Sequence, residues 1–178
     1  MSKKIRYLAA LLAVGILGVA GVNYFLVHRN VQQILASDER NQGVGIFAHY
    51  KYFVLPSELV IDLRKISGTN SPADVTRVLL QLAQSQKART YKSVTLAHHG
   101  KSKFLLKVEF FQILGIEFGT QNPMYTMRTL PENVYNIDGT AAFETWTGGM
   151  LGVLSKQMED FSDFHKQWYI ADLGRHAQ

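Results

Sequence analysis

The chain has 178 residues, 47% hydrophobic and 19% charged, so it can bury the core of one domain. It contains no cysteine, which excludes a disulfide framework, a thiolate metal site and a cysteine nucleophile. The net charge is +5, but residues 1–40 already carry +3, from five basic and two acidic side chains. The larger part of the chain is therefore close to charge balance, and we expect no nucleic-acid partner.

Residues 8–27 read LAALLAVGILGVAGVNYFLV and contain no charged side chain. A helix of this length rises about 30 Å, at about 1.5 Å per residue, which matches the hydrocarbon core of a bilayer. A signal peptide cleaved at Gly18-Val19-Ala20 is the alternative. The apolar run continues beyond that point, which favours an uncleaved transmembrane helix and makes the lipid bilayer a predicted partner.

The charges beside this segment predict its orientation. Lys3, Lys4 and Arg6 precede it, whereas Arg29 follows it. The positive-inside bias places residues 1–7 in the cytoplasm as a tail and the rest of the chain outside. For a bacterial host, that means the inner membrane and the periplasm.

The remaining chain predicts a short helical stalk at 28–42 and one extracytoplasmic α+β domain at 43–178. Its first half contains two β-prone stretches and then a helix that begins after a turn. Ser71 is a suitable N-cap for that helix, with Pro72 in its first turn. The predicted elements are strands at 49–55 and 58–66 and a helix at 72–87.

The second half predicts a hairpin, a helix, a short strand and a long amphipathic helix. These elements cover strands 91–97 and 103–107, a helix at 108–117, a strand at 125–130 and a helix at 146–173. We expect a mixed or antiparallel sheet covered by helices. Gly148, Gly149 and Gly152 lie at the start of the last helix and predict close packing against a neighbour or a kink there.

Three side chains are candidates for acid–base catalysis, although no catalytic motif is present. Asp62 lies within a predicted strand, and Asp160 and His165 lie on the last helix. A structural salt bridge or a solvent-facing position for Asp62, and a buried structural role for His165, are the simpler interpretations. The adjacent His98 and His99 are interpreted as a solvated hairpin turn. The sequence predicts neither a metal site nor a cofactor.

The segment 120–133 is rich in amides and hydroxyls and lies between two prolines. Its side chains either satisfy the backbone of their own loop or form a binding surface together with the segment that begins at Trp146. The candidate binding residues are Gln121, Asn122, Tyr125, Arg128, Glu132, Asn133, Trp146 and Thr147.

Charge is segregated along the chain. Seven basic residues and no acid lie between Asp74 and Glu109, whereas the segment from Glu132 to Asp172, both included, contains seven acids and two lysines. The asymmetry predicts either attraction of a partner or of anionic lipid, or pairing within the domain. The candidate basic surface comprises Lys92, Lys101, Lys103 and Lys107.

These features favour a membrane-anchored binding or assembly module, an accessory or scaffold subunit of a complex with other membrane or envelope proteins. One alternative is an extracytoplasmic sensor of a small ligand or an envelope polymer. A second alternative is a small hydrolase or transferase that uses a carboxylate–histidine pair.

Overall fold

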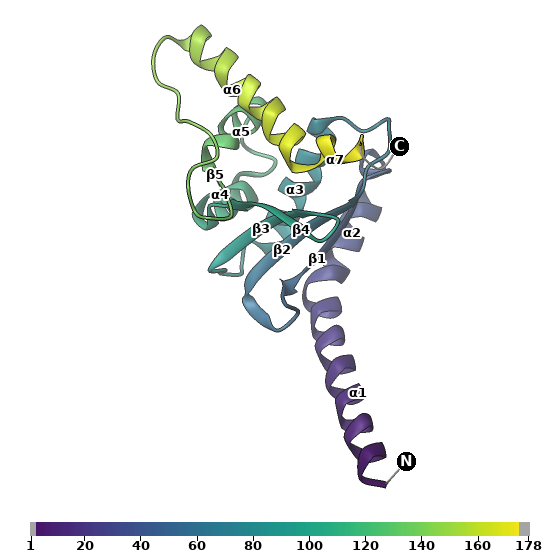
Figure 1. The fold of residues 1–178 in the computed structure, drawn as a ribbon. Coiled ribbons are helices and arrows are strands. Elements are labelled where there is room, and N and C mark those ends of the chain that lie inside the picture. Colours follow the sequence, from purple (N-terminus) through teal and green to yellow (C-terminus); the bar gives the residue numbers. More distant parts are fainter. Residues whose placement is uncertain (1–2, 175–178) are drawn as a thin grey trace.

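The computed structural model describes residues 3–174. A five-stranded mixed sheet forms the centre of the molecule, and a long helix leaves it at the N-terminal end (Figure 1). The strands lie in chain order, and only β2 and β3 are parallel. The α+β class and the mixed sheet are thereby confirmed. The strands are β1 (Gly45–Lys51), β2 (Leu55–Lys65), β3 (Ser93–His98), β4 (Lys101–Leu106) and β5 (Val134–Tyr135).

The N-terminal helix is continuous with the segment predicted to be a stalk. Helix α1 (Lys3–Asn23) passes through a π-helical turn, Tyr24–His28, into α2 (Arg29–Ser37). Val27 and Val31 are fully buried in the hydrophobic core. The segment predicted as a short helical stalk at 28–42 is helical over Arg29–Ser37, and it packs against the core through Val31. Val27 and Val31 lie one helical turn apart, and this part of the helix packs against β1 and α3.

The helix α3 (Pro72–Gln86) follows β2 and begins as the sequence predicts. Ser71 and Asp74 form a capping box, in which each side chain bonds to the other's backbone N–H. The helix packs against α4 (Val108–Glu117). The sequence predicts α4 at these residues, but not its contact with α3. Gly115 permits their close approach, because a Cβ at this position would collide with the backbone carbonyl of Ala83.

The region after α4 differs from the prediction. Residues 125–129 of the predicted strand at 125–130 belong to a helix, α5 (Pro123–Thr129). Asn122 caps this helix by accepting a hydrogen bond from the backbone N–H of Met124 at 2.9 Å. The fifth strand is Val134–Tyr135, which pairs with β4. The cap and Pro123 start a helix here, and they outweigh the weak alternation of residues 125–130.

The long C-terminal helix is shorter and less regular than predicted. It comprises α6 (Met150–His165), a π-helical turn at Lys166–Ile170 and α7 (Ala171–Leu173). Trp146 lies outside it, and Gly148, with φ +132°, stands two residues before the helix begins. Apart from chain neighbours and the backbone of the same helix, no atom of the described residues lies within 4 Å of where a Cβ of Gly148, Gly149 or Gly152 would be. The prediction that these glycines permit close packing is therefore wrong.

The hairpin between β1 and β2 is the other departure from the predicted elements. The sequence predicts a strand throughout 49–55, but residues 52–54 form the turn. Tyr52 and Phe53 have φ values of 52° and 64°, in the left-handed region that non-glycine residues rarely adopt. β-prone aromatic residues thus occupy a turn.

Candidate functional site

The junction between the apolar helix and the sheet is built around Asn23, the one strongly polar residue of the apolar segment. Its Oδ1 accepts a hydrogen bond from the backbone N–H of Tyr50 at 2.8 Å, and its Nδ2 donates to the carbonyl oxygen of Phe53. Asn23 is only 4% exposed. The amide therefore satisfies buried backbone groups at the end of β1 and ties α1 to the β1–β2 hairpin.

The tip of this hairpin consists of Tyr52, Phe53, Val54 and Leu55, and we call it the hairpin tip. Their side chains are exposed by 73%, 43%, 58% and 36%. Phe53 donates its backbone N–H to the carbonyl of Tyr50 at 2.8 Å, and its ring stacks on His49. An ion pair of 2.8 Å between Lys51 and Glu58 closes the base of the hairpin. The turn is thus held in place while its apolar side chains face outward.

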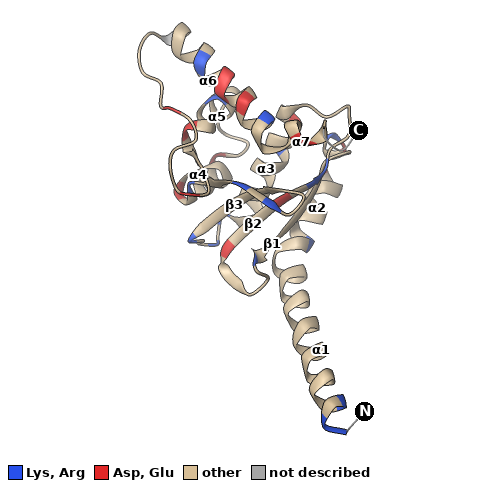
Figure 2. Ribbon diagram, in the orientation of Figure 1, with Lys and Arg blue, Asp and Glu red and all other residues tan. Residues whose placement is uncertain are grey.

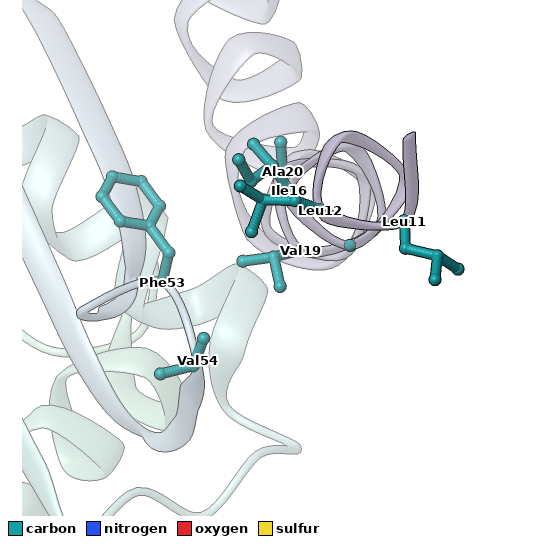
Figure 3. Close-up of a pocket in the computed structure, with 8 residues that line it drawn as sticks. Leu11, Leu12, Ile16, Val19, Ala20, Phe53 and Val54 are labelled. Carbon is teal, nitrogen blue, oxygen red and sulfur yellow. The ribbon is translucent and has the colours of Figure 1, made fainter. Parts of the chain in front are cut away.

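An apolar groove of about 580 Å³ lies between the hairpin tip and α1 (Figure 3). Phe53 and Val54 form one wall. The other wall follows α1 and comprises Leu11, Leu12, Gly15, Ile16, Val19 and Ala20. No charged side chain lines the groove. It continues toward a second apolar hollow of about 280 Å³ beside Phe47 and His28.

Basic side chains lie at this same end of the sheet. β2 and β3 are parallel, so both begin at the same end of the sheet. The β1–β2 hairpin and the last residue of β4 lie at this end as well. Arg89 donates to the hydroxyl oxygen of Tyr50 at 2.7 Å, and the backbone of Lys92 bonds to Ser57. We call the cations Lys87, Arg89, Lys92 and Lys107 the basic rim. In Figure 2, α1 carries charge only at its N-terminal end.

The predicted basic surface is divided between the two ends of the β3–β4 hairpin. Lys92 and Lys107 lie at the end near α1, whereas Lys101 and Lys103 lie at the opposite end, where Lys101 faces His98 in the sheet. Lys103 forms a 2.7 Å ion pair with Asp172. Part of the charge segregation is therefore pairing within the domain.

The sequence predicts that His98 lies in a solvated turn, and this is wrong for His98. It is the last residue of β3 and is 2% exposed. Its Nδ1 lies 3.1 Å from Oδ2 of Asp172. The ammonium of Lys103 and the imidazole of His98 hold the pKa of Asp172 well below its usual range. His99 alone occupies the turn, with φ 48°. This cluster joins the sheet to the C-terminal helix.

The three candidate catalytic residues do not converge. Asp62 is fully buried, accepts a backbone hydrogen bond from Gly100 and pairs with Arg64 at 2.5 Å. Asp160 accepts a hydrogen bond from Nε1 of Trp146 at 2.6 Å. Each carboxylate thus has a structural partner, which leaves no carboxylate–histidine pair among these three residues in the described part of the chain.

His165 is fully buried among the aromatic rings of the C-terminal helix. Its Nε2 lies 3.0 Å from the hydroxyl oxygen of Thr76 on α3. Burial lowers the pKa of His165 to about 3, so the imidazole is neutral at physiological pH. The side chain joins α3 to α6 and has no access to a substrate.

The candidate binding residues of segment 120–133 lie on both sides of α5. Tyr125, Glu132 and Asn133 line a cleft of about 290 Å³ against α4, together with Ile113. Burial raises the pKa of Glu132. We call this cleft the α4–α5 groove.

The other candidates of this segment take different positions. Asn122 is the cap of α5, and Arg128 donates to Gln157 on α6 at 3.3 Å. Trp146 is bound to the same helix through Asp160, while Thr147 is exposed. Arg128 and Trp146 thus each bond to α6, through Gln157 and Asp160, whereas the other candidates lie elsewhere.

Gln121 lines a separate cleft of about 440 Å³ between α3 and α5, with Arg40 and Arg77 at its rim. Arg40 pairs with Asp38 at 2.7 Å and Arg77 pairs with Asp74 at 2.9 Å. The two cations are therefore neutralised within the domain, and the cleft presents no unpaired arginine to an anion.

Within residues 3–174 the structure contains no group of three or more histidine, aspartate or glutamate side chains that could hold a metal ion. Sequence reasoning missed the hairpin tip, because its residues resemble a strand. The signal that could have indicated it is the run of four consecutive apolar residues, 52–55, directly before Pro56. Such a run interrupts the alternation of polar and apolar residues that a half-buried strand shows. Comparisons with protein-family models, curated proteins and solved structures find no match to this chain.

Proposed function

We propose that this protein is a single-pass membrane-anchored assembly module, an accessory or scaffold subunit of a membrane complex. The observation that carries the proposal is the bare apolar helix α1, fastened at Asn23 to a folded domain. The described part of the chain contains one helix that is long and apolar enough to cross a membrane. Only 11% of the most apolar 18-residue stretch of this helix is buried within the protein. A core helix would be mostly covered, so the low burial supports a lipid-facing role.

The α4–α5 groove supports the binding part of the proposal. Ile113 and Tyr125 on its rim are 43% and 44% exposed, next to the polar groups of Glu132 and Asn133. Apolar anchors surrounded by polar side chains are the composition of protein-docking surfaces. We propose that another membrane or envelope protein docks here, on a part of the domain distinct from α1.

The anchor and its orientation are tested with single-cysteine variants, because the natural chain has no cysteine to interfere. Lys101→Cys places a thiol on the domain, and Lys4→Cys places one before the apolar segment. A membrane-impermeant maleimide should label the first variant in intact cells and the second only after permeabilisation. The reverse pattern would invert the orientation. The intact mass of the membrane-extracted protein separates an anchor from a signal peptide cleaved near Ala20.

The partner is tested by extraction in mild detergent and mass analysis of the intact assembly. A fixed stoichiometry with a defined protein supports an accessory subunit. Ile113→Asp should release that protein, whereas Lys101→Asp, at the other end of the sheet, should not. A monomer or homodimer in the extract would contradict the proposal.

A sensor of a small ligand is the second candidate, and its site would be the 440 Å³ cleft beside Gln121. Because Arg40 and Arg77 are already paired there, the cleft fits a neutral polar ligand better than an anion. The catalytic alternative has less support, because Asp160 bonds to Trp146 and His165 to Thr76.

A further inference from the structure

The apolar part of α1 is too short to cross a bilayer below the level of the sheet. Residues 7–22 lie between Arg6 and the buried Asn23, and these 16 residues rise about 24 Å. The hydrocarbon core of a bilayer is about 30 Å thick. A membrane that surrounds α1 must therefore extend past Asn23, up to the exposed rings and aliphatic side chains that follow it, Tyr24, Phe25 and Leu26.

The hairpin tip lies within that depth. The carbonyl of Phe53 bonds to the side chain of Asn23, so the tip starts at the level of this residue. Phe53 and Val54 then share a groove with Val19 and Ile16, which precede Asn23 by one and two helical turns (Figure 3). A bilayer that covers Ile16 and Val19 has to cover the hairpin tip as well.

The composition of the hairpin tip agrees with this depth. Its four side chains carry no charge, and Tyr52 adds a phenol, the type of side chain enriched where the hydrocarbon meets the headgroups. In water, consecutive exposed apolar residues promote aggregation. Tyr52 and Phe53 hold this outward arrangement in the left-handed region, a conformation that costs about 1 kcal/mol or more for such residues.

The charges at this end of the sheet identify the surface that the tip enters. Lys87 and Lys92 are exposed, and Lys107 lies beside them at the end of β4. Glu58 at this end is paired with Lys51, and Glu109, two residues after Lys107, offsets one of the remaining cations, so the basic rim keeps a net positive charge. Cations at headgroup level attract anionic phospholipid, at about 1 kcal/mol for each.

We propose that the hairpin tip, residues 52–55, is a second membrane-inserted element, embedded in the same leaflet as the C-terminal end of α1. The groove between the two is filled by phospholipid acyl chains, and the basic rim lies on anionic headgroups. This inference rests on the proposed anchor. Two attachments in place of one fix the tilt of the domain and hold the α4–α5 groove at a set height above the bilayer.

The test uses the full chain in nanodiscs of phosphatidylcholine and phosphatidylglycerol, with a nitroxide on single cysteines. Val54→Cys probes the hairpin tip, Leu12→Cys is the lipid control, and Lys101→Cys is the water control. Collisions with oxygen, which enters lipid, are compared with collisions with a nickel chelate, which stays in water. We expect the Val54 site to resemble the Leu12 site, with oxygen favoured several-fold over nickel.

Two results would overturn the inference in distinguishable ways. A Val54 site that resembles Lys101, while the Leu12 site stays in lipid, would disprove insertion of the tip and leave the anchor intact. Nickel access at all three sites would disprove the anchor as well. Should Val54→Cys fail to fold, Tyr52→Cys offers a second probe, since its side chain is 73% exposed.

Discussion

The backbone N–H of Tyr50 donates to Oδ1 of Asn23 at 2.8 Å, and this bond ties the apolar helix to the edge strand of the sheet. The same amide also donates to the carbonyl of Phe53. An asparagine within an apolar helix would leave its polar atoms unsatisfied in lipid. Here it completes the hydrogen bonds of the hairpin backbone instead, so its position fixes where the continuous helix meets the sheet.

Replacement of Asn23 should therefore weaken the whole junction. Asn23→Leu keeps the size of the side chain but leaves the Tyr50 N–H and the Phe53 carbonyl without this partner. We expect a loss of about 1–3 kcal/mol in the free energy of unfolding. Chemical unfolding in detergent micelles measures it. Gln33→Leu, at an exposed amide on α2, is the matched control, and equal stability of the two variants would contradict the prediction.

His165 should make the protein less stable in mild acid. Its pKa is about 3 in the folded state, lowered by burial from an ordinary value of 6.5. Between these values the unfolded chain binds a proton that the folded chain does not. The free energy of unfolding should thus fall as pH falls below 6.5, by up to about 1.4 kcal/mol per pH unit. Above pH 6.5 this contribution is constant.

The measurement is urea unfolding at intervals from pH 7.5 to pH 4.5, in the natural chain and in His165→Gln. The glutamine can still bond to Thr76, but it has no titrating group in this range. Its stability should vary less with pH than that of the natural chain. Parallel curves for the two proteins would show that His165 is not the source of the acid sensitivity.

Lys103 and Lys101 form a matched pair on one hairpin. Lys103 lies 2.7 Å from Asp172, and it is the main reason why the pKa of this carboxyl is low. Removal of the ammonium in Lys103→Met should raise the pKa of Asp172 toward its ordinary value. Lys101→Met, at an exposed position, should leave it nearly unchanged.

The sign of the effect on stability follows from linkage. A carboxyl whose pKa is lowered by folding stabilises the protein above its ordinary pKa, and the contribution is lost as pH falls below about 4. As the pH falls from 4 to 2, the free energy of unfolding should decrease less in the Lys103→Met variant than in the natural chain. A carboxyl NMR titration follows Asp172 directly. An unchanged Asp172 titration in Lys103→Met would contradict the ion pair.

Two glycines should respond to alanine in opposite directions. Gly115→Ala places a methyl group against the backbone carbonyl of Ala83, so α3 and α4 have to separate. Overpacking of this kind costs about 1–3 kcal/mol. Gly152→Ala adds a methyl group in open space inside α6 and should stabilise the helix by about 0.5–1 kcal/mol. Thermal unfolding measures both, and shifts of the same sign would contradict the packing described.

Local sequence patterns determined much of this protein. The helix at residues 3–23 contains the long apolar run that begins at Leu8 and predicts it, and Ser71 with Pro72 starts α3 at the predicted residue. The sequence also predicts β2 and β3 close to their observed positions, at 58–66 and 91–97, but not their parallel pairing. These features depend on neighbours in the chain, so the sequence alone can indicate them.

Tertiary structure decided the partners. Asp172 reaches His98 across 74 positions, and Asn23 reaches Tyr50 across 27, and no local pattern indicates either pairing. The tight glycine is Gly115 and not Gly152, because space around a glycine depends on the helix that packs against it. Residues 52–55 have the composition of a strand, but they form an exposed tip because α1 and β1 are joined beside them. Burial, pairing and exposure are properties of the assembled fold, and only the structure could assign them.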